Sequence, residues 1–194
     1  MLSQYKLSLP ALTADTASSG ASLLLKGAQA NYGFVPNMFT YMANSPGLLA
    51  TYFQGHDQFR ADSGFSAIEQ EVVFLTVAVE NGCEYCVSAH SLVADAMSKV
   101  PAAVTNAIRE GNTPPDTKLA ALSVFTRTMV AKRGLPTRND VEQFLAVGYT
   151  ERQILEVILA IAVKTISNYA NHIVHTPLDA AFASRAWSDC RAAQ

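Results

Sequence analysis

The sequence is poor in charged residues and in cysteine, and this poverty excludes several classes of protein. Charged residues make up 15% of the 194 residues, against roughly 25% in a typical soluble domain. With 49% hydrophobic residues the chain is too apolar for a disordered protein, and three cysteines are too few for a small disulfide-stapled scaffold. The formal net charge of -2 offers no basic excess to neutralise a phosphate backbone, so we expect no nucleic-acid partner.

The sequence also has no long hydrophobic run and no recognisable targeting signal. The longest apolar run near the C-terminus, from Val157 to Val163, is bounded by Glu156 and Lys164 and is shorter than the roughly 20 residues that a membrane span requires. Residues 1–10 contain one lysine and no apolar core of a signal peptide. We therefore expect a cytoplasmic protein with no membrane partner. Because the surface has few charges, we also expect a homo-oligomer.

Helical periodicity runs through nearly the whole chain, and the prolines and glycines fall between the periodic segments. The apolar run from Val72 to Leu75 has some β propensity, but helical spacing and capping on both sides outweigh it. The sequence thus predicts one all-α domain over residues 1–194. Helices are predicted over residues 16–31, 46–60, 67–81, 83–98, 101–110, 117–132, 140–147 and 151–174, with a short one after Pro177. Two of them begin with capping boxes, at Ser66 and Thr150.

Two of the three cysteines lie where one of these helices begins, directly after Gly82. Cys83, Cys86 and His90 are spaced three and then four residues apart, so they share one helix face. Free N–H groups and the positive end of the helix dipole favour a thiolate there, and an adjacent imidazole can accept the thiol proton. A second thiol one turn away can attack an oxidised sulfur and close a disulfide. The pattern therefore indicates a reactive cysteine pair.

Glu71 is the only charged residue on the apolar arc of the preceding predicted helix. The opposite side of that helix carries the polar residues Glu69, Gln70, Thr76, Glu80 and Asn81. A buried carboxylate needs a partner, and its pKa is then perturbed. Because the chain turns back at Gly82, Glu71 could lie near Cys83 and hold or pass a proton. The alternative is an ordinary carboxylate at a helix end or an interface.

A metal site is the main alternative for the same cysteines. Cys83, Cys86 and His90 would need a fourth ligand, which His172 or His175 could supply. Since the chain has a single CxxC, we expect neither a metal nor a bound cofactor. Haem attachment would need a histidine directly after the second cysteine, and a thioredoxin fold would need a strand before the first. We interpret the His172 and His175 segment as a polar helix end that faces solvent or a subunit neighbour. We assign no chemistry to His56, Trp187 and Cys190.

The stretch from Glu71 to His90 resembles the alkylhydroperoxidase D-like (AhpD-like) proteins, which are part of the carboxymuconolactone decarboxylase superfamily. Their signature is a glutamate twelve residues before a CxxC and a histidine four residues after it, which are Glu71, Cys83, Cys86 and His90 here. Residues 32–37, the helix that begins at Pro46, residues 168–172 and residues 176–179 also look like the peroxidase-related branch. The resemblance covers residues 30–180 or so.

The resemblance implies an all-α AhpD-like fold with the CxxC at a helix N-terminus, a homo-oligomer (a trimer or hexamer), and peroxidase activity. By the same resemblance Cys86 is the peroxidatic nucleophile and Cys83 the resolving thiol, while His90 assists deprotonation of Cys86. Glu71 belongs to the proton relay that reaches Cys83. Tyr85 departs from the pattern, because some members carry a second histidine there. The expected partners are a small-molecule hydroperoxide and a reducing thiol or dithiol carrier protein.

Two other functions remain open on this sequence. One is a decarboxylase-like enzyme on the same fold, which would acidify a carbon next to a lactone or ketone without needing the cysteine pair. The other is a non-enzymatic thiol redox sensor, which would form the disulfide but turn over slowly. Replacing Cys86 by serine separates the first of these from a peroxidase.

Overall fold

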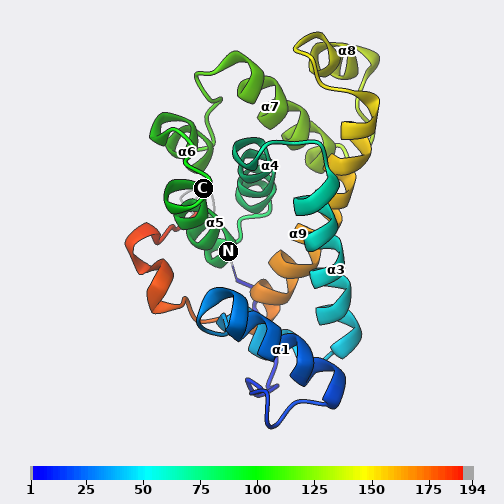
Figure 1. Ribbon diagram of the computed structural model, residues 1–194. Coiled ribbons are helices and arrows are strands. Elements are labelled where there is room, and N and C mark those ends of the chain that lie inside the picture. Colours follow the sequence, from blue (N-terminus) through cyan, green and yellow to red (C-terminus); the bar gives the residue numbers. More distant parts are fainter. Residues whose placement is uncertain (1, 190–194) are drawn as a thin grey trace.

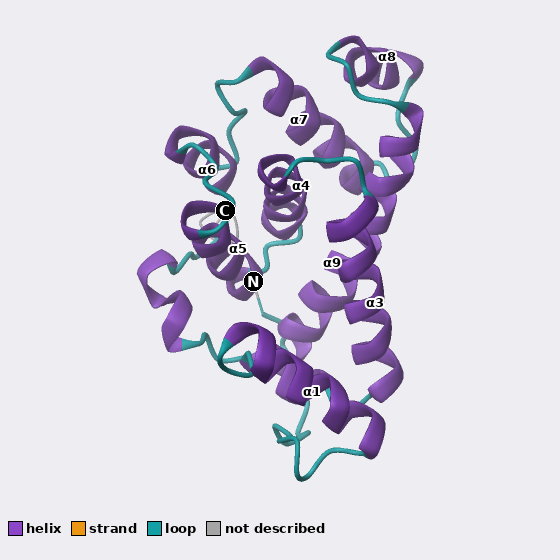
Figure 2. Cartoon of the chain, viewed as in Figure 1, coloured by secondary structure: helices purple, strands orange, loops and turns teal. Residues whose placement is uncertain are grey.

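The structure, a computed structural model, describes residues 2–189, and every regular element in that range is helical (Figures 1 and 2). The α-helices are α1 (Ser19–Tyr32), α2 (Asn37–Met42), α3 (Pro46–Asp62), α4 (Ala67–Glu80), α5 (Glu84–Ala96), α6 (Ala102–Arg109), α7 (Thr117–Ala131), α8 (Arg138–Ala146) and α9 (Glu151–Val174). A 3₁₀ turn, η1 (Ala180–Arg185), follows α9. The predicted all-α fold is confirmed, and Cys190 lies outside the described residues.

Capping fixes the helix starts that the sequence predicted. The Ser66 hydroxyl accepts from the Glu69 N–H, and the Glu69 carboxylate accepts from the Ser66 N–H at 2.8 Å, so both halves of the box are present. Thr150 does the same for α9. Three elements differ from the prediction. Helix α1 begins at Ser19 and not at residue 16, helix α2 was not expected, and α8 begins after a capping threonine, Thr137, slightly ahead of the predicted start.

Helix α4 lies at the centre of the molecule, with α5, α6, α7 and α9 packed around it (Figure 1). Its residues from Glu69 to Val79 are all buried, including those on the polar side. That side is satisfied by its neighbours: Thr76 hydrogen-bonds Ser123 on α7 at 3.0 Å, and Lys118 lies 3.0 Å from the Glu69 carboxylate. The helix that carries Glu71 is therefore the core of the fold and has no solvent-facing side.

The turn between α4 and α5 sets the position of the cysteines. Gly82 has a φ of 65°, a left-handed conformation that glycine adopts without a steric penalty. Here the chain reverses, and Cys83 becomes the N-cap residue of α5. The Asn81 side chain at this turn donates to the side chain of Asn168 at 2.9 Å, which ties the turn to α9.

Helix α9 is the one described helix that is long and apolar enough to cross a membrane by length and composition. Within its most apolar window, 44% of the residues are buried inside the protein. The buried positions include polar side chains, namely Lys164, Ser167, Asn168 and Asn171. Core helices of helical proteins pass the same test of length and composition.

The end of α9 contacts the N-terminal segment of the chain. Ser3 donates its N–H to the His172 carbonyl at 3.0 Å, and the His175 ring lies 2.7 Å from the Ser3 carbonyl. Leu7 adds a backbone hydrogen bond to the same helix end. This end was predicted to face solvent or a subunit neighbour, but in the structure the chain's own first residues cover part of it.

Candidate functional site

The two cysteines are free thiols, both buried, at the start of α5. Asn171 on α9 lies over them: its amide nitrogen is 3.3 Å from Cys86 Sγ and 3.8 Å from Cys83 Sγ. The Ser167 hydroxyl, one turn earlier on α9, lies 3.8 Å from Cys86 Sγ. An N–H donor aimed at a sulfur stabilises the thiolate more than the thiol. The environment therefore favours negative charge on Cys86.

The two thiols differ in acidity. Burial alone would raise the pKa of Cys86, but the hydrogen bond from Cys83 and the nearby charge of Lys164 bring it well below its usual value. Burial and the neighbouring Cys86 raise the pKa of Cys83 well above its usual value. The site thus favours the thiolate form at Cys86 over that at Cys83.

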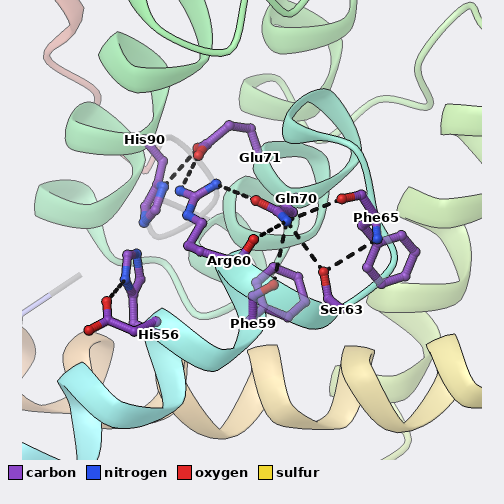
Figure 3. Close-up of polar contacts among 9 residues, drawn as sticks. His56, Phe59, Arg60, Ser63, Phe65, Gln70, Glu71 and His90 are labelled. Carbon is purple, nitrogen blue, oxygen red and sulfur yellow. Dashed lines mark hydrogen bonds and ion pairs between the residues drawn. The ribbon is translucent and has the colours of Figure 1, made fainter.

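Glu71, His90 and Arg60 form a buried cluster behind this pair (Figure 3). The His90 Nδ1 lies 2.9 Å from one oxygen of the Glu71 carboxylate, and the Arg60 guanidinium donates to the other. Arg60 also donates to the Gln70 side chain at 3.2 Å, and Gln70 in turn donates to backbone carbonyls at the end of α3 and in the loop that follows. Glu71 is therefore held between two helices with both oxygens occupied.

The charge state of Glu71 fixes the tautomer of His90. Burial would raise the pKa of Glu71, but His90 and Arg60 lower it from 4.5 to about 2, so the carboxylate is ionised and can only accept hydrogen bonds. Burial and the charge of Lys164 lower the pKa of His90, so its ring is neutral near neutral pH. His90 must then carry its proton on Nδ1, which leaves Nε2 as an acceptor for a proton.

A cavity of about 600 Å³ leads to Cys86. Its wall is mainly apolar and aromatic, and Cys86, His90, Arg60 and Lys164 are among its polar lining residues. Cys83 does not line it. The aromatic and apolar part of the wall includes Tyr32, Phe34, Met38, Phe39, Tyr52, Tyr85, Val93, Met97 and Phe182. A small organic molecule that enters this cavity would meet the sulfur of Cys86 and not that of Cys83.

Tyr85, which departs from the family pattern, braces one side of the cavity. Its hydroxyl donates to the Asp179 carboxylate at 2.5 Å, and its ring packs edge-on against Phe182. Asp179 also accepts from the N–H of Asn37 at 3.2 Å. The segments 32–37 and 176–179, which the sequence singled out separately, therefore meet at Tyr85.

The predicted site residues come together in part. Cys86 and His90 line one cavity, and Glu71 contacts His90 directly. The contacts of Glu71 are with His90 and Arg60, so it approaches the cysteines through His90. Among residues 2–189, no three His, Cys, Asp or Glu side chains are grouped to hold a metal ion, and His175 is engaged at the N-terminal segment instead.

Arg60, Lys164 and Asn171 were not identified from the sequence as site residues. Arg60 and Lys164 are on α3 and α9, far from the CxxC in sequence, and Asn171 is separated from Cys86 by 85 positions. The sequence did contain one signal for two of them: Lys164, Asn168 and Asn171 fall among the mainly apolar positions of the predicted helix over residues 151–174, where buried polar side chains need partners.

The comparisons with known proteins agree with this geometry. Residues 46–125 match the carboxymuconolactone decarboxylase family, a range that contains Glu71, both cysteines and His90. A comparison with curated protein sequences finds no match.

Three similar solved structures share the helical fold. A peroxidase-related protein from Ralstonia eutropha JMP134, an alkylhydroperoxidase AhpD core, is 20% identical with a TM-score of 0.80, over 90% of this chain and 93% of that one. A peroxidase-related protein from Silicibacter sp. TM1040 is 19% identical with a TM-score of 0.78, over 95% and 99% of the two chains. A cysteine-to-alanine variant of the debrominase Bmp8, in complex with 2,3,4-tribromopyrrole, is 17% identical with a TM-score of 0.68, over 84% and 87%.

Proposed function

We propose that this protein is a member of the AhpD-like group of the carboxymuconolactone decarboxylase superfamily and reduces organic hydroperoxides with Cys86 and Cys83. One observation carries the proposal: the two thiols are unequal. Cys86 lines the cavity and has a lowered pKa, whereas Cys83 lies off the cavity and has a raised pKa. A nucleophile and a resolving thiol require this division of roles.

In the first step the Cys86 thiolate attacks the outer oxygen of the hydroperoxide. The S–O bond forms as the O–O bond breaks, which leaves a sulfenic acid on Cys86 and an alkoxide. The alkoxide needs a proton to leave as the alcohol. His90 can take up a proton from water at Nε2 and pass it to the alkoxide, because Glu71 stabilises the imidazolium that forms in transit.

In the second step Cys83 attacks the sulfenic sulfur of Cys86. The S–S bond forms, the S–O bond breaks, and the hydroxyl leaves as water with the proton of the Cys83 thiol. The disulfide must then be reduced by an external dithiol or a dithiol carrier protein, which supplies two electrons. No bound cofactor takes part in this cycle.

The test is a single turnover of fully reduced protein with one equivalent of cumene hydroperoxide. We expect peroxide loss together with a Cys83–Cys86 disulfide, identified by mass spectrometry of the peptides. Cys83→Ser should still consume one equivalent and stop at the sulfenic acid, whereas Cys86→Ser should consume none. Unspent peroxide and intact thiols in the wild-type protein would refute the proposal.

Reductive dehalogenation is a second candidate, favoured by the aromatic wall of the cavity and by the similarity to a debrominase. Here the Cys86 thiolate would attack the bromine of an aryl bromide. An S–Br bond would form, the C–Br bond would break, and the ring carbon would take up a proton. Cys83 would then displace bromide to close the same disulfide, again with a dithiol as the source of two electrons.

The two candidates are separated by their products. Reduced protein mixed with a polybrominated pyrrole releases bromide ion if dehalogenation occurs, and bromide can be counted against the disulfide formed. A decarboxylase-like enzyme would differ from both, because its turnover would survive Cys86→Ser. A redox sensor would complete one turnover but would not sustain cycling with excess dithiol.

A further inference from the structure

Lys164 is a buried lysine that lines the same cavity as the reactive cysteine. Its side chain is 1% exposed, and it lines the cavity together with Cys86. Within residues 2–189 its ammonium makes no hydrogen bond or ion pair, and its recorded contact is the ring of Phe74, whose centroid lies 5.7 Å away. A buried cation is costly unless an anion compensates it.

The face of α9 that carries Lys164 is the face that meets Cys86. Lys164, Ser167 and Asn171 are spaced three and four residues apart, so they line up along one side of the helix. Ser167 and Asn171 both place a polar atom within 4 Å of Cys86 Sγ, at 3.8 and 3.3 Å. Lys164 is the next residue in the same row.

The charges around the cavity do not balance unless one more anion is present. Arg60 and Lys164 are two cations, and Glu71 is the carboxylate behind them. Both oxygens of Glu71 are already occupied by Arg60 and His90. His56 and His90 add no lasting charge, because burial above all lowers both pKa values, that of His56 to about 3.

Asp179, which contacts the cavity-lining Tyr85, is engaged as well. It accepts from the Tyr85 hydroxyl and from the Asn37 N–H. The group that can compensate the positive charge of Lys164 is therefore the sulfur of Cys86, which lines the same cavity.

We propose that Lys164 is the counter-ion of the Cys86 thiolate and keeps that sulfur in its reactive form. The proposal deepens the proposed function, since it concerns the same nucleophile, but it makes a claim about charge that holds without any substrate. His90 is assigned the transfer of a proton, whereas Lys164 is assigned the compensation of charge at the sulfur. Lys164 therefore acts through Cys86 and does not itself react. The pKa of Cys86 is lowered, and the charge of Lys164 contributes to that shift, which agrees with this role.

The experiment measures the pH dependence of Cys86 alkylation by iodoacetamide in reduced protein, with the modified peptide identified by mass spectrometry. The variants are Lys164→Met, which removes the charge, and Lys164→Arg, which keeps it. Lys118→Met is the matched control. Lys118 also lies over an aromatic ring, that of Tyr149, but it is near Glu69 at the start of α4, whereas the cysteines follow the end of that helix.

Several other titratable or charged groups surround Cys86 and Lys164. They are Tyr52, His56 and Arg60 on α3, Glu71 on α4, Cys83 at the N-cap of α5, Tyr85 and His90 on α5, and His172 on α9.

Lys164→Met should move the alkylation midpoint of Cys86 up by about one pH unit or more, which makes alkylation about tenfold slower on the acid side of that midpoint. Lys164→Arg should restore most of the rate, and Lys118→Met should match the wild type. An unchanged midpoint in Lys164→Met would overturn the proposal, and so would equal shifts in the Met and Arg variants.

A reciprocal measurement tests the same coupling in a variant that changes one atom. If the thiolate and the ammonium stabilise each other, Cys86→Ser must loosen the Lys164 ammonium, because coupling between two sites is mutual. NMR of the side-chain nitrogen reports this as faster exchange of the ammonium hydrogens with water. An unchanged exchange rate in Cys86→Ser would overturn the proposal even if Lys164→Met did not fold. Both readouts work without peroxide, so a protein that failed to reduce hydroperoxides could still show the coupling.

Discussion

Replacing Glu71 by glutamine should destabilise the fold in a pH-dependent way. Glu71 is 1% exposed, and its two oxygens hold Arg60 on α3 and His90 on α5. Glutamine keeps the shape but removes the charge, and its amide nitrogen cannot accept from either donor. Breaking one partner out of a buried charge pair leaves the other uncompensated, which is far costlier than losing a surface pair.

The magnitude follows from the lowered pKa of Glu71. Its fall from 4.5 to about 2 corresponds, at about 1.4 kcal/mol for each tenfold change in acidity, to roughly 3 kcal/mol of stability. A lowered carboxyl pKa contributes its full stability above the unfolded value and loses it as the pH falls through the folded value. The contribution of Glu71 is therefore complete above 4.5 and disappears towards 2.

The assay is urea unfolding of the wild-type and Glu71→Gln proteins at a series of pH values. The difference in the free energy of unfolding should be roughly 3 kcal/mol at about pH 7 and should shrink as the pH falls below 4.5, because the wild-type carboxylate then loses the charge that glutamine lacks. Glu80→Gln is a matched control on the same helix. Its partner is Arg127 at a partly exposed site, so we expect a loss of about 1 kcal/mol or less. A Glu71→Gln difference that stays constant over the acid range would refute the reasoning.

Three further predictions concern the thiols, the cavity and the packing. Asn171→Leu removes the amide donor to the reactive sulfur, and it should slow alkylation of that thiol by about tenfold, measured by peptide mass spectrometry in reduced protein. Val93→Phe narrows the cavity, and it should raise KM for cumene hydroperoxide while leaving the rate with hydrogen peroxide unchanged in a steady-state assay. Gly55→Ala would place a Cβ 2.7 Å from a Val163 methyl, whereas Gly47→Ala on the same helix meets open space. In thermal unfolding the first variant should therefore be less stable than the second by about 1–3 kcal/mol, and equal melting temperatures would contradict this packing argument.

The helix boundaries could be predicted because they are set locally. Ser66 and Thr150 satisfy the first N–H groups of their helices with their own side chains, which is a property of four consecutive residues. Helix α2 escaped prediction because it has six residues and no side-chain cap, and its place depends on Asp179 accepting from the N–H of Asn37. That contact joins positions 142 apart in the sequence.

The depth at which α4 is buried could not be read from its periodicity. An apolar arc on one side and polar residues on the other normally indicate a helix at the surface. Here the polar side is buried as well, since Ser123 and Lys118 on or next to α7 supply partners for Thr76 and Glu69. A polar pattern shows that a side chain needs partners, but not whether water or protein provides them.

The site residues that are close in sequence could be predicted, whereas those that come from distant helices could not. Cys83, Cys86 and His90 share a face of one helix, so spacing alone predicted their proximity. Glu71 was predicted near Cys83, but its observed contacts are His90 and Arg60. Arg60, Lys164 and Asn171 reach the site only because α3 and α9 pack against the central helix pair, and no periodicity within α5 carries that information.

Two cations near the ring of Phe74 have different electrostatic roles: Arg60 pairs with Glu71, and we propose that Lys164 pairs with Cys86. Arg60 and Lys164 both lie near Phe74, at 4.8 and 5.7 Å from its ring centroid, and the buried Lys164 in particular requires a compensating anion. Arg60 is committed to Glu71, which fixes the proton position on His90. If Lys164 also paired with Glu71, the carboxylate would have three donors competing for two oxygens, and the thiolate would lose the counter-ion that we propose for it. In the roles that we propose for these residues, the separation of the two pairs lets the imidazole exchange protons while the sulfur keeps its charge.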